Sequence, residues 1–197
     1  MNDSSQNGKV MTMNAEDIKA FVIAGHGNLD NVKSMLEATP ELLNVAYEWS
    51  PGDFETALAG ASHVGNADIA RYLLERGAPM TATTAAMLGR TAELNAILEA
   101  EPDLIQATGA HGITLLTHAA LSGDADLVSS LYARGATTGS SMALNLAVHS
   151  GHLEVSKFLL ERAQPDLNWK NFKGLTALEV ARDAGRTDLV RLLEGAA

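Results

Sequence analysis

The sequence predicts an all-α solenoid of about six helix pairs joined by short hairpin fingers. A sequence motif recurs along the chain, in which a glycine is followed three residues later by an acidic residue and then by an aliphatic residue. Leucine pairs followed by glutamate close several of the units. Repetition of this kind indicates small units stacked on their neighbours rather than one globular core. The clearest copies of the motif are Gly65–Ile69, Gly123–Leu127, Gly151–Val155 and Gly185–Leu189.

Each unit reads as two short helices separated by the glycine. In the fifth unit, apolar residues run from Met142 to Val148, and further apolar residues recur at helical spacing from Leu153 to Leu159. A glycine between two helices suits a tight left-handed turn, and an acid in the next first turn complements the helix dipole. The predicted pairs are 15–25 with 29–37, 55–63 with 67–75, 79–87 with 91–99, 114–121 with 125–133, 141–149 with 153–161, and 176–183 with 187–194.

The glycines also keep a longer period. The separations from Gly27 to Gly89, from Gly89 to Gly151 and from Gly123 to Gly185 are each 62 residues. This spacing indicates three copies of a two-repeat unit, in which the two repeats differ in the length of chain that precedes them. The sequence therefore predicts that full-length connections stand on alternate repeats.

These motifs resemble the ankyrin repeat family over roughly residues 15–197. The segments that carry the resemblance are Gly174–Leu178, Thr114–Ala120 and Gly151–Leu160. The family pattern Gly-x-Thr-Pro-Leu-His-x-Ala-Ala is present in altered form, with its proline replaced by Ala57, Leu115, Ala143 and Ala177. The resemblance implies that β-hairpin fingers join the repeats and that fingers and first helices line a concave binding face. It implies a shared scaffold and not a shared ligand.

The first finger differs from the others. It carries about four more residues than the fingers at 106–114 and 168–176. Its aromatic residues Tyr47, Trp49 and Phe54 are of the kind that stabilises interfaces. Either these side chains face a partner, or Trp49 and Phe54 fold back over the first repeats. The finger also holds three acids that we expect to form an acidic rim: Glu48, Asp53 and Glu55.

We expect a partner protein to bind the fingers and the concave ends of the first helices. Lys170 and Lys173 make the third finger basic, so a partner spanning both fingers would meet opposite charges about 40 Å apart. On these grounds Trp49→Ala should weaken partner binding without unfolding the protein. The expected partner-binding residues are Tyr47, Glu48, Trp49, Phe54, His63, His111, His149, Phe172, Lys173 and Leu175.

Composition limits the class of protein and of partner. Residues 1–14 are polar, without a signal-peptide core, and we expect a disordered leader followed by one solenoid domain over 15–197. The chain has no cysteine, which fits a reducing, cytoplasmic compartment, and no apolar run long enough to cross a membrane. Its net charge of −10 disfavours nucleic acid and favours a protein with a basic or mixed-charge surface. A monomer is favoured over an oligomer.

Catalytic and metal motifs are not evident in the sequence. The chain has six histidines but neither a His-Glu-x-x-His motif nor a cysteine–histidine cluster. His63 and His149 hold equivalent positions three repeats apart, which places them about 30 Å from each other. We therefore expect no catalytic residue, no metal ligand and no cofactor, and a binding module rather than an enzyme. The alternatives are a hydrolase or metal-binding protein that uses a histidine site on the same scaffold, or a homo-oligomer.

Overall fold

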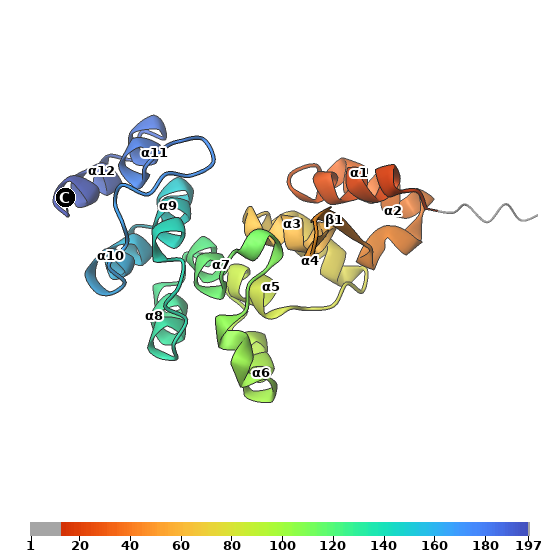
Figure 1. Cartoon of the computed structure of the whole chain (residues 1–197), viewed down its shortest axis with the longest axis horizontal. Coiled ribbons are helices and arrows are strands. Elements are labelled where there is room, and N and C mark those ends of the chain that lie inside the picture. The colour runs from red at the N-terminus through yellow and green to blue at the C-terminus, as the bar shows by residue number, and fades with distance from the viewer. Residues whose placement is uncertain (1–12, 197) are drawn as a thin grey trace, which may run out of the picture.

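A computed structural model describes residues 13–196 of the chain and confirms the all-α solenoid. The helix pairs follow one another in chain order along the long axis of the molecule, from α1 and α2 at one end to α11 and α12 at the other (Figure 1). The first helices of the pairs are α1 (Ala15–Gly25), α3 (Ala57–His63), α5 (Ala82–Met87), α7 (Leu115–Ser122), α9 (Ser140–Ser150) and α11 (Ala177–Asp183). The second helices are α2 (Leu29–Ala38), α4 (Ala67–Glu75), α6 (Thr91–Ala100), α8 (Ala125–Ala133), α10 (Leu153–Arg162) and α12 (Thr187–Glu194).

Threonine side chains begin four of the six first helices. Thr56, Thr81, Thr114 and Thr176 each accept a hydrogen bond from the backbone N–H three residues later, at 3.1–3.3 Å. Such N-caps satisfy donors that the helix itself leaves unpaired, and each is worth about 1 kcal/mol. The threonine of the repeat pattern therefore marks the start of these four first helices.

The predicted left-handed glycine turns between paired helices are confirmed in five of the six pairs. Gly65, Gly89, Gly123, Gly151 and Gly185 have φ between 64° and 84°, in the left-handed region that favours glycine. The first such glycine, at position 27, does not have a positive φ.

The apolar core runs between the pairs rather than through one centre. Its residues form two clusters, one over the first two repeats and one from α5 to the C-terminal pair. Leu73, Leu131 and Leu159 are at most 1 % exposed, which confirms their predicted burial. Alanines at the contact surfaces of the first helices let neighbouring pairs approach closely; Ala85, Ala119 and Ala147 are among those fully buried.

Three long fingers alternate with short connections, as the spacing predicts. The first finger follows the 3₁₀ segment η1 (Pro40–Asn44) and is an antiparallel hairpin of β1 (Ala46–Ser50) and β2 (Asp53–Thr56), with a bulge near its turn. The second contains η2 (Pro102–Gln106) and η3 (Ala110–Gly112) and is closed by a bridge between Thr108 and Thr114. The third spans residues 163–176, and its Asn171 N–H donates to the Leu175 carbonyl at 3.0 Å.

The expected leader at residues 1–14 lies outside the described residues, except for Met13 and Asn14. Asn14 accepts a hydrogen bond from the Asp17 N–H at 2.8 Å and caps α1, while Met13 packs against the N-terminal core cluster. Among the described residues, no helix is long and apolar enough to cross a membrane.

We predict that Leu131→Ala lowers the free energy of unfolding by about 2–5 kcal/mol, because the change leaves a cavity between stacked repeats. Ile23→Ala is the matched control, since Ile23 is 52 % exposed and its truncation should change stability by no more than about 0.5 kcal/mol. Urea unfolding followed by circular dichroism measures both values. Equal effects of the two substitutions would contradict the assigned core.

A second prediction concerns His118, which is 1 % exposed and whose Nδ1 lies 2.9 Å from the Thr114 carbonyl oxygen. Burial lowers the pKa of His118 from 6.5 to about 4. The unfolded chain then binds more protons than the folded chain between these values, so stability is full above pH 6.5 and falls as the pH drops towards 4. Relative to His118→Gln, the wild-type protein should lose about 3 kcal/mol of unfolding free energy over this range. Parallel pH curves for the two proteins would refute the assignment.

Candidate functional site: a histidine–glutamate cluster beneath the first finger

Strand β2 of the first finger turns Asp53 and Glu55 inward and Phe54 outward. Side chains alternate between the two faces of a strand, and in β2 the side chain of Glu55 is 0 % exposed whereas Phe54 is 57 % exposed. The expectation that Glu55 would belong to an acidic rim was therefore wrong. The buried carboxylate is compensated by an indole and three imidazoles that surround it.

Each oxygen of Glu55 has its own neighbours. Trp49 Nε1–H donates to Oε2 at 2.6 Å. The other oxygen, Oε1, lies 3.0 Å from His63 Nδ1, 3.4 Å from His26 Nε2 and 3.6 Å from His111 Nε2. The imidazole rings of His26 and His63 meet edge to face with centroids 4.9 Å apart, and those of His63 and His111 do so at 5.3 Å. Four separate chain segments therefore meet at one carboxylate.

The second finger holds the first in place. The His111 backbone N–H donates to Asp53 Oδ1 at 2.8 Å, and His111 Nδ1 lies 2.7 Å from Asp53 Oδ2. His111 has a φ of 58°, which is uncommon for a residue other than glycine. The hydrogen bonds from the His111 backbone and ring lower the pKa of the Asp53 carboxyl. A two-point contact of this kind fixes the relative position of two loops that are 58 residues apart in the sequence.

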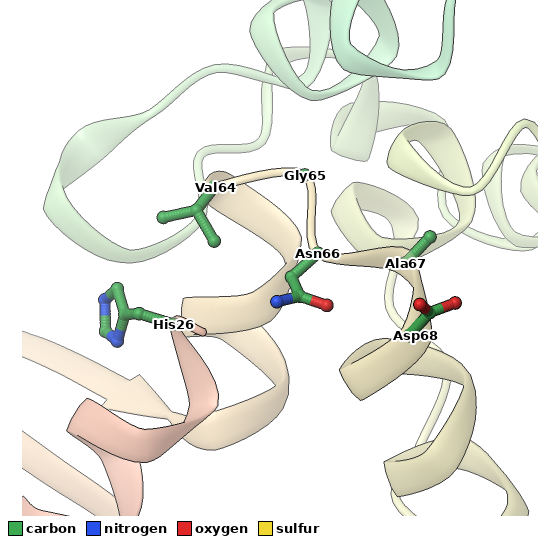
Figure 2. Close-up of a pocket in the computed structure, with 6 residues that line it drawn as sticks. All are labelled: His26, Val64, Gly65, Asn66, Ala67 and Asp68. Atoms are coloured by element: carbon green, nitrogen blue, oxygen red, sulfur yellow. The ribbon is translucent and has the colours of Figure 1, made fainter. Parts of the chain in front are cut away.

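His26 reaches the cluster from the end of α1. Its Nδ1 lies 3.0 Å from the Val22 carbonyl oxygen, so the nitrogen that faces Glu55 is Nε2. A side chain on Gly60 would place a Cβ 2.9 Å from the His26 ring, so this glycine leaves room for the imidazole. Figure 2 shows the ring beside Val64, at the edge of an open hollow that is also lined by the start of α4.

The charges in the cluster favour an ionised carboxylate. Burial alone would raise the pKa of Glu55, but the charges and close contacts of the His26 and His63 imidazoles outweigh burial and hold this pKa below its ordinary range. The side-chain contact with Glu55 raises the pKa of His26. Among the described residues, Glu55 Oε1 and His63 Nδ1 are buried without a well-oriented hydrogen-bond partner. The Glu55 carboxylate is therefore ionised, buried and incompletely satisfied.

The structure separates the expected binding residues into three groups. Trp49, His63 and His111 belong to the cluster, and Tyr47 packs edge-on against Trp49 with ring centroids 4.9 Å apart. Of the two alternatives for Trp49, the inward orientation applies to its indole N–H, which donates to Glu55. Trp49 is nevertheless 37 % exposed. The remaining expected residues lie outside the cluster: Glu48, which accepts from the Gly52 N–H in the hairpin turn, Phe54, His149, Phe172, Lys173 and Leu175.

Sequence reasoning missed three members of the cluster, namely His26, Asp53 and Glu55. One signal was present, because His26 and His63 both stand just before the inter-helix glycine in consecutive repeats. Comparing His63 with the distant His149 instead led to the expectation that the chain has no metal ligand.

Comparison with known protein families agrees with this architecture. A model of three successive ankyrin repeats matches residues 116–196, and a model of one ankyrin repeat matches residues 53–85. A search of curated proteins finds no match. The matched segments together cover more than half of the chain, and their helix pairs are those of the structure. The chain belongs to the ankyrin repeat family.

Proposed function

We propose that this protein binds another protein through its fingers and the adjoining ends of its first helices. Ankyrin repeats are generally protein–protein interaction modules and are typically non-enzymatic. The observation that carries the proposal is Phe172, which stands at the tip of the third finger with 94 % of its side chain exposed. Large aromatic side chains on surface loops are the residues that most often dominate binding energy at interfaces.

Further exposed apolar side chains near the other end of the molecule support the proposal. Of the large hydrophobic side chains that are exposed in residues 13–196, four belong to the first two repeats and the first finger: Ile23, Trp49, Phe54 and Val64. The contact between Asp53 and His111 holds this finger before any partner arrives. A loop that is already ordered loses less conformational entropy on binding, which favours affinity.

Charge and composition refine the proposed partner. The net charge of −10 favours a partner with a basic or mixed-charge surface. The lack of cysteine supports binding in a reducing compartment such as the cytoplasm. The proposal treats the protein as a monomer, and size-exclusion chromatography with light scattering distinguishes it from self-association through the aromatic residues.

We predict that Phe172→Ala and Phe54→Ala each weaken partner binding about 10- to 30-fold, the loss expected when an interface aromatic is truncated. Proteins retained by the wild-type chain from a lysate of its source cells would be identified and their affinities measured. Lys157→Ala on the second helix of the fifth repeat serves as the control and should bind like wild type. If both phenylalanine variants also bind like wild type, the proposed surface is wrong.

Trp49→Ala is expected to act differently from the two phenylalanine variants. It removes the indole N–H that satisfies Glu55 Oε2, and an unsatisfied buried acceptor costs about 1–3 kcal/mol. We therefore predict a lower melting temperature for Trp49→Ala, whereas Phe54→Ala should melt like wild type. Thermal melting of the three proteins tests this, and an unchanged melting temperature for Trp49→Ala would contradict the inward role of its indole.

A further inference from the structure

We propose that His26, His63 and Glu55 form a binding site for a divalent transition-metal ion such as Zn²⁺, with His111 as a fourth donor. The ligand atoms of the first three residues all lie within 4.8 Å of one another. They come from the end of α1, the end of α3 and strand β2, and His111 comes from the second finger. The proposal does not rest on Phe54 or Phe172, the exposed phenylalanines whose role in partner binding is tested separately.

The distances from Glu55 Oε1 to the three imidazole nitrogens are close to those between neighbouring ligands of a tetrahedral ion. Zinc lies about 2.0–2.1 Å from imidazole nitrogens and carboxylate oxygens, so neighbouring ligand atoms of a tetrahedral ion are about 3.4 Å apart. The three nitrogens lie 3.0, 3.4 and 3.6 Å from Glu55 Oε1.

The groups behind the donors are arranged as in metal sites. A histidine ligand commonly uses its second ring nitrogen to bond a carbonyl or carboxylate, which fixes the ring and the nitrogen that binds the ion. Here His26 Nδ1 faces the Val22 carbonyl and His111 Nδ1 faces the Asp53 carboxylate, so both rings present Nε2 to Glu55. The Trp49 indole holds Glu55 Oε2 and leaves Oε1 as the donor.

Burial supplies a second and independent argument. The Glu55 side chain is 0 % exposed, yet its Oε1 lacks a well-oriented hydrogen bond, and the same is true of the nearby His63 Nδ1. A buried acceptor and a buried ring nitrogen that face each other at 3.0 Å without hydrogen-bond geometry are both satisfied by one cation between them. The His26 side chain is 30 % exposed and borders an open hollow, so one of the donors is reached by solvent.

The donor set selects the class of metal. Imidazoles with one carboxylate suit Zn²⁺, Cu²⁺ or Ni²⁺, whereas Ca²⁺ and Mg²⁺ require mostly oxygen ligands. The rival occupant of the cluster is a proton, which converts one histidine to an imidazolium beside the Glu55 carboxylate. Protons and metals compete for the same nitrogens, so metal affinity should fall as the pH is lowered.

The test uses the full-length chain without a histidine tag, treated with chelator and then dialysed. Titration calorimetry with Zn²⁺ at pH 7.5 should show one ion per chain, and Ca²⁺ or Mg²⁺ should give no binding. At about 100 times the dissociation constant, Zn²⁺ should raise the melting temperature by about 5–10 °C. Co²⁺ offers a spectroscopic check, because tetrahedral Co²⁺ absorbs strongly in the visible range.

Matched variants locate the site. His26→Gln and His63→Gln should each weaken Zn²⁺ binding at least 10-fold and reduce the Co²⁺ absorption, while their circular dichroism in chelator stays that of the wild type. His149→Gln is the control, because His149 occupies the position equivalent to His63 in a different repeat and is exposed. It should bind Zn²⁺ like wild type.

Two results would overturn the proposal. Wild-type protein that binds no Zn²⁺ at one ion per chain would assign the cluster to a proton-linked ion pair. Binding that survives His26→Gln and His63→Gln unchanged would place the ion elsewhere. Because Phe54 and Phe172 are untouched in these variants, failure here leaves the partner-binding proposal to its own test.

Discussion

The whole structure depends on one constraint, because no helix pair can bury its apolar face alone. Leu73, Leu131 and Leu159 are buried because a neighbouring pair covers them, and the alanines of the first helices bring that neighbour close. Stability in such a stack is a sum of interactions between neighbours. The connections between pairs are consequently free to vary in length, and this chain uses that freedom to carry three long fingers.

The first repeats depart from this plan because they contain a buried charge. Glu55 is fully buried, and its carboxylate is compensated by Trp49 and three histidines. A buried ion of this kind is costly unless it is paired. Its contacts join two first helices to two fingers, so the compensation also fixes the geometry of the surface above it.

Neighbouring residues of the first finger therefore have different roles, since some hold the hairpin in place and one faces solvent. Glu55 and Asp53 face the cluster and hold the finger, while Phe54 between them faces solvent. A binding loop held in this way presents its aromatic residue at little entropic cost. The third finger has no comparable histidine contact to another finger among the described residues, and its Phe172 is correspondingly the more exposed of the two phenylalanines.

The sequence by itself determined the helix pairs, because their signals are local. Threonine caps, glycines with positive φ and leucines at helical spacing act within a few residues, and the predicted pairs agree with the structure to within about four residues at their ends. The alternation of long and short fingers followed from spacing in the same way. The candidate site was not predictable by these means, because only the tertiary structure brings His26, Glu55, His63 and His111 together. Whether a finger residue faces inward or outward depends on strand alternation and on contacts such as Asp53 with His111, which are set by packing between repeats and not by local sequence.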